Sequence, residues 1–199
     1  LSLVRYASQM GLSTECVTNC FWAESEESAK GYLDDLADTG LDVINLSVDD
    51  FHQSQISFDR VRNCYAVAKL LGLKVVIMCA AGRSSRLRVS EVARLLGDEG
   101  IQIIRGGEIK STHSALAIET GFVPAGRASQ IPREEWLIGD GPLDGPCRVV
   151  LRDVAISPSG RVLPCCSAAG IVEGFEIGNA RVSRLGKIIE EAGRLSLFR

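Results

Sequence analysis

No apolar run in the 199-residue sequence reaches the roughly 18 to 20 residues that a membrane-crossing helix requires. The sequence also lacks a basic excess, since its net charge of −3 gives no positive field for nucleic acid. It shows no charged start followed by an apolar core and a small-residue cleavage site, the pattern that export requires. We therefore expect a cytoplasmic protein that binds neither nucleic acid nor a membrane.

The cysteines do not fit a secreted disulfide scaffold, because their number is odd (seven) and they lie scattered through strand and helix patterns. Three of them form a group of another kind. Cys147 is followed by Gly160 after twelve residues and then by the pair Cys165-Cys166, in the spacing C-x12-G-x4-C-C. A turn at the glycine would bring the chain back towards Cys147. Soft thiolates gathered in this way hold zinc or an iron–sulfur cluster.

The other cysteines are interpreted mainly as packing residues. Cys64 lies on the apolar stripe of an expected helix and Cys79 at the end of a buried strand, where free cysteine acts as a small hydrophobe. Cys16 and Cys20 form a C-x3-C pair, which is a poor metal site without a third partner.

Strand patterns start near residues 13, 42, 73 and 101, roughly 30 residues apart, which is the length of one βα unit. Apolar stripes at helical spacing lie between them, two of them behind the N-cap candidates Ser25 and Ser57. Consecutive strands joined by helices run parallel with right-handed crossovers. The pattern predicts an α/β fold with an arc of a (β/α) barrel, and a doubly wound sheet is the alternative. Ser111–Thr120 is predicted as one further helix, ended by Gly121.

The periodicity breaks down between residues 129 and 146, which are rich in proline and glycine. Beyond this stretch, Arg148–Ile156 and Arg161–Leu163 flank a Ser-Pro-Ser-Gly turn signature and predict a β-hairpin. A closing helix is expected between Val182 and Ala192. The chain is therefore divided into a partial parallel barrel (1–128), a linker (129–146) and a small hairpin-and-helix domain (147–199).

Polar residues gather where the expected strands end, and ligands bind at this edge of parallel α/β sheets. The residues concerned are Thr18, Asn19, Ser47, Asp49, His52, Cys79, Arg83 and Arg105. Ser47 and Asp49 point to the same face of an extended segment, which suits hydrogen bonds to a ribose or an amino-acid carboxylate. The alternative is that both residues end the strand and satisfy local backbone groups. His52 is left open as an acid, a ligand or a loop residue.

Several segments resemble radical S-adenosylmethionine enzymes, in the order in which that family carries them. Thr18-Asn19-Cys20 is similar to a Thr-Asn-Gly turn after the third strand, and Ser47-Val48-Asp49 with His52 resembles a segment after the fourth. Gly126-Arg127-Ala128 resembles a motif found after the sixth strand. The spacing of Cys147, Gly160 and Cys165 is similar to the opening of the twitch or SPASM auxiliary-cluster domain of the family.

The sequence also departs from the family. The C-x3-C-x2-C loop that binds the catalytic [4Fe-4S] cluster is absent, and Gly106-Gly107-Glu108 lies four strands too late to be the methionine-binding motif. Cys20 and Asp50 stand where glycine is usual. The chain opens at Leu1 within a helical pattern and stops at Arg199 without a terminating signal. From these features we expect an internal fragment of a longer enzyme, with the ligands of the catalytic cluster outside this chain.

The resemblance implies a role for several residues. Ser47 would contact the ribose or methionyl end of S-adenosylmethionine, and Asp49 would shape the same loop. Asn19, Arg60 and Arg127 complete the implied cofactor-binding set, with Arg60 pairing with the methionyl carboxylate. Cys147 and Cys165, with Cys166, would bind an auxiliary iron–sulfur cluster. Both adjacent cysteines can serve one cluster only if the strand ends at Pro164, because neighbours within a strand point opposite ways.

The function that the resemblance implies is hydrogen abstraction by a 5′-deoxyadenosyl radical. The substrate is expected to be a peptide or protein, and the electron donor a flavodoxin or ferredoxin. Without the three-cysteine loop, the chain alone is expected to be inactive. Two alternatives stay open at this stage. One is a non-catalytic relative that binds a peptide or a metal, and the other is a zinc-stapled (β/α) barrel enzyme that acts through Asp49 and His52.

Overall fold

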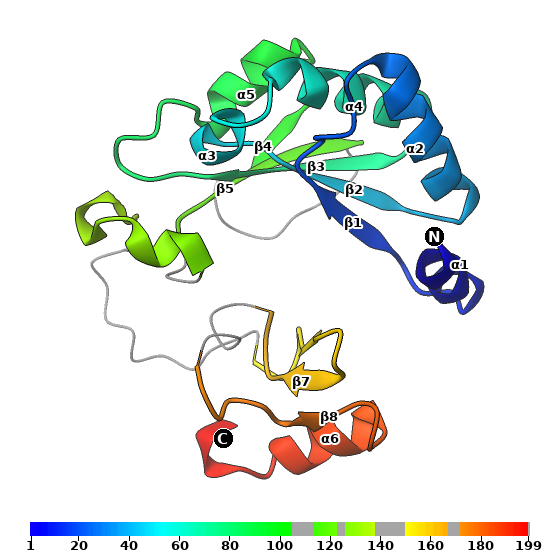
Figure 1. Cartoon of the computed structure of the whole chain (residues 1–199), viewed down its shortest axis with the longest axis vertical. Coiled ribbons are helices and arrows are strands. Elements are labelled where there is room, and N and C mark those ends of the chain that lie inside the picture. Colours follow the sequence, from blue (N-terminus) through cyan, green and yellow to red (C-terminus); the bar gives the residue numbers. More distant parts are fainter. Residues whose placement is uncertain (105–113, 123–125, 138–149, 167–171, 199) are drawn as a thin grey trace. The chain divides into compact units, whose positions relative to one another are not determined.

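The computed structural model describes residues 1–104, 114–122, 126–137, 150–166 and 172–198 (Figure 1). The chain divides into two compact units. The first comprises Leu1–Phe122 with Glu134–Leu137, and the second comprises Val123–Arg133 with Ile138–Arg199. None of the helices in the described ranges is both long enough and apolar enough to cross a membrane.

The first unit is built on a five-stranded parallel sheet with the strand order β1-β2-β3-β5-β4. Its strands are β1 (Glu15–Thr18), β2 (Val43–Ser47), β3 (Lys74–Ala80), β4 (Gln102–Ile104) and β5 (Ala115–Thr120). Its helices are α1 (Ser2–Gln9), α2 (Glu26–Asp38), α3 (Asp50–Gln53), α4 (Phe58–Leu70) and α5 (Val89–Leu96). The predicted parallel α/β architecture, with a separate hairpin domain, is confirmed.

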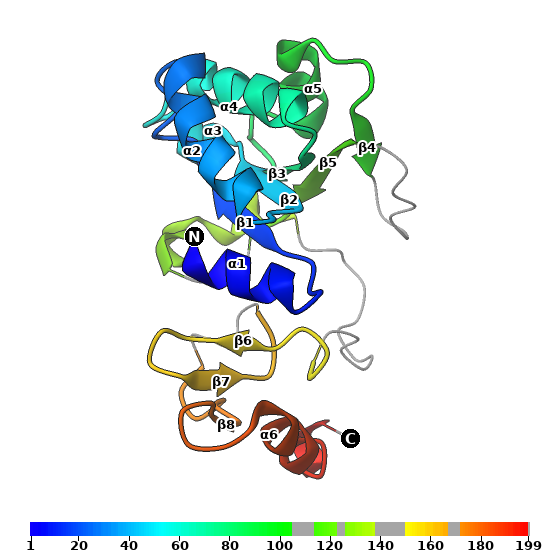
Figure 2. The ribbon, with the colours of Figure 1, turned by 90° about the vertical axis from the view of Figure 1, so that its right-hand side faces the viewer.

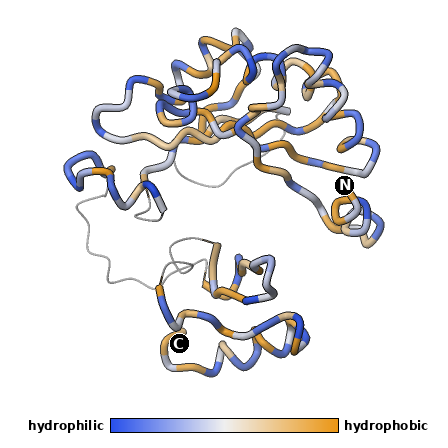
Figure 3. The backbone as a smooth tube through the Cα atoms, in the orientation of Figure 1, coloured by the Kyte–Doolittle hydropathy of each residue, from blue (hydrophilic) through white to orange (hydrophobic). Residues whose placement is uncertain are grey.

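Helices α2, α4 and α5 cover one face of the sheet, while α1 lies apart from them beside the start of β1 (Figures 1 and 2). Alternate strand residues such as Ile44, Val75 and Ile77 are buried in the core under these helices. Figure 3 shows the strands as the most continuously hydrophobic part of this unit. The helix starts follow from capping: the hydroxyl of Ser25 accepts from Ser28 N, and that of Ser57 accepts from Asp59 N.

The helix predicted over Ser111–Thr120 is wrong. Ala115–Thr120 is strand β5, which lies between β3 and β4 and pairs with both, while residues 111–113 lie outside the described part. The segment Ala-Leu-Ala-Ile is compatible with a helix by local preference. In the fold, however, its backbone N–H and C=O groups form hydrogen bonds with β3 on one side and β4 on the other. These tertiary contacts outweigh the local preference for a helix.

The second unit contains a three-stranded antiparallel sheet in the order β6-β7-β8 and a closing helix. Its elements are β6 (Ala155–Ile156), β7 (Arg161–Leu163), β8 (Gly178–Asn179), α6 (Leu185–Ala192) and the 3-10 turns η1 (Gly126–Gln130) and η4 (Ser196–Phe198). A further 3-10 turn, η2 (Arg133–Glu135), lies where the two units divide.

The predicted hairpin is confirmed, with a shorter first strand than expected. Gly160 N donates to Ser157 O (2.9 Å) and Ser157 N donates to Arg161 O (2.9 Å), so a tight turn joins β6 to β7. Residues 150–152 form a turn and residues 153 and 154 are irregular, so none of them belongs to a strand, and residues 148 and 149 lie outside the described part. The closing helix is also present, but it begins at Leu185, and Val182 is 84% exposed outside it.

Candidate functional site

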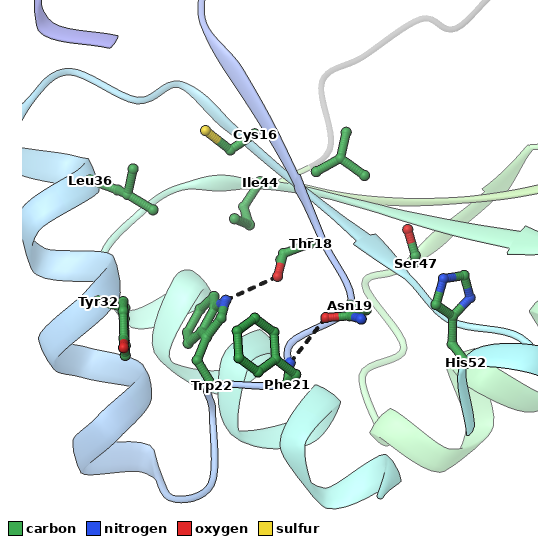
Figure 4. A pocket seen from close by; sticks show the side chains of 11 residues that line it. Cys16, Thr18, Asn19, Phe21, Trp22, Tyr32, Leu36, Ile44, Ser47 and His52 are labelled. Atoms are coloured by element: carbon green, nitrogen blue, oxygen red, sulfur yellow. Dashed lines mark hydrogen bonds between the residues drawn. The ribbon is translucent and has the colours of Figure 1, made fainter. Parts of the chain in front are cut away.

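A cavity of about 520 Å³ lies along β1 and the loop that follows it, and reaches the end of β2 (Figure 4). It combines strand-end polar groups with aromatic and aliphatic side chains. Its lining residues are Cys16, Val17, Thr18, Asn19, Phe21, Trp22, Tyr32, Leu36, Ile44, Ser47 and His52. The structure therefore brings Asn19, Ser47 and His52, which the sequence placed at strand ends, to one cavity.

The loop after β1 is held by the side chains at its own start. Thr18 Oγ1 accepts from the indole Nε1 of Trp22 (3.1 Å), and Asn19 Oδ1 accepts from Phe21 N (3.2 Å) (Figure 4). Cys20 is fully buried and has φ of +63°, in the left-handed region that glycine adopts most easily. A hydrogen bond to Cys64, together with burial, raises the pKa of the Cys20 thiol. The Cys20 thiol therefore stays protonated, and we interpret Cys20 and Cys64, which are both fully buried, as packing residues.

Helix α4 ties down the same loop. The guanidinium of Arg60 donates to Phe21 O and also to Glu24 Oε1 (2.7 Å). Asn63 Nδ2 donates to Ala23 O (3.1 Å). The arginine that the resemblance assigns to a methionyl carboxylate thus binds the loop after β1 in this structure.

Asp49 organises the start of α3. Asp49 is 2% exposed, and one carboxylate oxygen, Oδ1, accepts from Phe51 N (3.0 Å) and from His52 N (3.0 Å). The same oxygen lies 2.9 Å from His52 Nδ1. Asp49 is therefore the N-cap of α3 and a support for the imidazole. Ser47, half-buried at the end of β2, makes no side-chain hydrogen bond to a residue within the described ranges.

Two carboxylates that had no predicted role hold the loop after β3. Asp50 accepts from Arg86 N (2.7 Å) and Leu87 N (3.1 Å). Glu135 accepts from the backbone N–H (2.9 Å) and the hydroxyl (2.7 Å) of Ser84. These hydrogen bonds lower the pKa of Glu135. One hint of these contacts was visible in the sequence: position 50 is aspartate, whereas radical S-adenosylmethionine enzymes usually have glycine there.

An ion pair links the residue before α5 to β5, next to the end of β3. Arg88 binds Glu119 through Nε (3.1 Å) and Nη2 (2.5 Å), and its Nη1 donates to Gly82 O (3.1 Å). Burial, followed by the negative charges of Asp49 and Glu119, raises the pKa of Cys79 to about 12. Cys79 is fully buried and its thiol donates to Leu87 O (3.3 Å), so it packs as predicted. Arg83 is exposed, and Arg105 lies outside the described residues.

In the second unit, Cys165 and Cys166 follow directly after β7. The strand ends at Leu163 and Pro164 is buried, so both cysteines lie beyond the end of the strand. Cys165 is half-buried and Cys166 is exposed. Leu151 N donates to Pro164 O (2.8 Å), so the chain four residues after Cys147 runs beside the residue before Cys165. Cys147 itself lies outside the described residues.

Arg127, the remaining implied cofactor residue, lies in η1 of the second unit and is exposed. Within the described ranges, no three His, Cys, Asp or Glu side chains are grouped closely enough to hold a metal ion. The thiols nevertheless have the right chemistry for iron, because soft anionic sulfur is its ligand in clusters.

Residues 147–199 match SPASM, an iron-sulfur cluster-binding domain. The match begins at Cys147 and contains Gly160, Cys165 and Cys166. The C-terminal part of the chain is therefore similar to an iron–sulfur cluster-binding domain, and the match includes the cysteines whose spacing resembled this domain. The match does not extend into the first unit. No curated protein matches the chain.

Proposed function

We propose that this chain is part of a radical S-adenosylmethionine enzyme, with the first unit as its partial barrel and residues 147–199 as its auxiliary-cluster domain. The observation that carries this proposal is the match of residues 147–199 to SPASM, in a chain whose earlier residues form a parallel βα sheet. SPASM domains are typical of the auxiliary clusters of this enzyme class. A cluster and S-adenosylmethionine together supply a 5′-deoxyadenosyl radical, which abstracts a hydrogen atom from the substrate.

The cavity of the first unit supports a nucleoside-type ligand. Ser47 and Asn19 offer polar groups at one end, and Trp22 and Tyr32 pack at its side with ring centroids 5.0 Å apart. Aromatic rings provide stacking surfaces for a planar base, and the hydroxyl and amide groups suit a ribose. In this role, the bonds from α4 to the loop after β1 would keep Asn19 and Phe21 in place for the ligand.

The open edge of β1 also agrees with a barrel. In the described part of the chain, β1 pairs only with β2, so its other edge can accept a further parallel strand. We propose that the C-x3-C-x2-C loop, absent from these 199 residues, comes from such an additional βα segment. The substrate is proposed to be a peptide or protein, the electron donor a flavodoxin or ferredoxin, and the compartment the cytoplasm. These last proposals rest on family analogy.

Loading the chain with iron and sulfide under anaerobic conditions tests the cluster. Iron, sulfide and zinc are measured in the wild type and in the variants Cys147→Ser, Cys165→Ser and Cys166→Ser. Loss of iron and sulfide in Cys147→Ser and Cys165→Ser is expected, because each removes a thiolate ligand. Cys16→Ser, at a half-buried cysteine of the first unit outside the matched residues, serves as the control and should keep the metal. Bound zinc without sulfide would instead favour the zinc-stapled alternative.

Binding of S-adenosylmethionine to the chain tests the first unit separately. Calorimetry or NMR titration should show binding that Ser47→Ala weakens, because the hydroxyl faces the cavity. Leu70→Ala is a suitable control, since Leu70 is 77% exposed on α4 and does not line the cavity. Equal binding to both variants would argue against the assigned cofactor site.

A further inference from the structure

His52 is held in one orientation by a buried carboxylate. Its Nδ1 lies 2.9 Å from Asp49 Oδ1, and Asp49 is 2% exposed. An ionised carboxylate only accepts hydrogen bonds, so Nδ1 must carry the hydrogen. In the neutral ring the other nitrogen, Nε2, is then a hydrogen-bond acceptor with a free lone pair. The capping bonds from Asp49 to Phe51 N and His52 N do not need the imidazole, so the ring contact is additional to the cap.

The imidazole lines the cavity and is accessible. The His52 side chain is 37% exposed, and Figure 4 shows its ring beside Ser47, with the rings of Phe21 and Trp22 further along. No residue within the described ranges donates to Nε2. The neighbouring carboxylate of Asp50 is taken by Arg86 N and Leu87 N, so it does not compete for the ring. Nε2 of His52 is thus a hydrogen-bond acceptor at the cavity, and the carboxylate of Asp49 fixes its orientation. A base held by a second side chain in this way is the arrangement found in general base catalysis.

We propose that His52 accepts a proton from a hydroxyl or ammonium group of the molecule bound in this cavity, with Asp49 as its positioning residue. The O–H or N–H bond of the ligand breaks, its electron pair stays on the ligand atom, and the proton bonds to Nε2. The resulting imidazolium keeps its Nδ1–H on the carboxylate of Asp49, which stabilises the new charge. This role goes beyond the proposed function, which gives His52 no task, and it does not depend on the identity of the ligand.

NMR of the full chain with ¹⁵N-labelled histidine tests the orientation. The chain contains two histidines, His52 and His113, and the His113→Gln variant assigns their signals. The neutral ring of His52 is expected as the Nδ1–H tautomer, the reverse of the form that dominates in free histidine. Asp49→Ser is the matched variant, because serine caps a helix as well as aspartate does but its shorter side chain lacks the carboxylate. The fold should persist in this variant while the tautomer preference is lost. An Nε2–H tautomer in the wild type would overturn the proposal.

Acylation by diethyl pyrocarbonate tests the reactivity of Nε2. The wild-type His52 should react several-fold faster than His52 in Asp49→Ser, because the carboxylate stabilises the positive charge that forms on the ring. A rate that Asp49→Ser leaves unchanged would refute the positioning role. Adenosine is added as a probe in a further arm. If adenosine fails to slow the reaction while the tautomer and the rate difference hold, the nucleoside site of the proposed function fails and the role of His52 stands.

Discussion

Gly160 lies directly against Asn179, where a Cβ on the glycine would come within 2.7 Å of Asn179 Oδ1. That oxygen also accepts from Arg181 N (2.9 Å), so it cannot move away without breaking this local hydrogen bond just after β8. Gly160 has φ of +87°, in the region that residues with a Cβ rarely adopt. The glycine in the C-x12-G-x4-C spacing is therefore required both by the turn and by the close contact with β8.

Gly160→Ala should destabilise the second unit for both of these reasons. The left-handed conformation costs about 1–2 kcal/mol for a residue with a Cβ, and the forced contact costs about 1–3 kcal/mol more. Urea denaturation measures the loss, and iron content after loading should fall with it. Gly174→Ala separates the two contributions, because Gly174 has φ of +78° but no atom within 4 Å of a built Cβ. Equal losses in both variants would contradict the contact with Asn179.

The thiols should differ in their reaction with iodoacetamide. In the iron-free chain at pH 8, exposed Cys166 should be alkylated first. Buried Cys20, Cys64 and Cys79 should stay unmodified, since the thiolate is the reactive form and the pKa of Cys79 is raised to about 12. Loading with iron and sulfide should then protect Cys166. Mass spectrometry of peptides gives the order, and early labelling of Cys79 in the folded chain would contradict it.

Stability at low pH should depend on Asp98. Hydrogen bonds from Tyr65 Oη (2.6 Å), Lys69 and Gly100 N lower the pKa of Asp98 in the folded chain. A carboxyl group whose pKa is lower in the folded state stabilises the fold above its unfolded pKa of about 3.9, and this contribution is lost as the pH falls through the folded pKa. Asp98→Asn should therefore lower the unfolding temperature at pH 7 and flatten its fall below about pH 4.

Tyr65→Phe provides the matched variant, because it removes the largest single cause of the shift and leaves the ring in place. Its effect should have the same sign as that of Asp98→Asn and be smaller. Thermal unfolding followed by circular dichroism between pH 2 and pH 7 measures both. A fall at low pH that is as steep in Asp98→Asn as in the wild type would exclude this source of acid sensitivity.

Asn45 lies on the face of the sheet opposite α2, α4 and α5, and it lowers the stability of the fold. It is 9% exposed; its Nδ2 donates to Glu15 Oε1 (2.9 Å), but its Oδ1 is buried without a partner in the described part of the chain. A buried polar group without a partner costs about 1–3 kcal/mol. Asn45→Leu, which is close in volume, should leave the free energy of unfolding unchanged or raise it. Asn63→Leu is the contrast and should destabilise, because it removes the bond to Ala23 O.

Local rules predicted the parts of the fold that depend on sequence neighbours. The caps at Ser25 and Ser57 and the turn at Gly160 each involve residues a few positions apart, and all three are present. Strand β5 was missed because its conformation is decided by β3, whose residue Val75 pairs with Ala115 forty residues away in the sequence. The two-residue strand β8 was missed for a similar reason, since only the contact with β7 identifies it.

In the candidate site, too, local features were predictable and contacts between distant residues were not. Asn19 and Ser47 were expected at the edge of the sheet because strand ends are visible in the sequence, and both line the cavity. The carboxylates of Asp50 and Glu135 hold backbone groups 36 and 51 residues away, a pairing that no local pattern encodes. The contact between Asp49 and His52 spans three residues, but whether a strand-end aspartate meets a ligand or its own helix depends on the fold around it.

The adjacent aspartates at the start of α3 face different neighbours. Asp49 hydrogen-bonds to the imidazole of His52, and Asp50 accepts hydrogen bonds from two backbone N–H groups of the loop after β3. Asp49 is the N-cap and Asp50 the first residue of the four-residue helix α3, so the start of one short helix contacts both the imidazole and the loop after β3. Two adjacent carboxylates therefore connect the segment that follows β2 both to a cavity-lining side chain and to the backbone of the loop after β3.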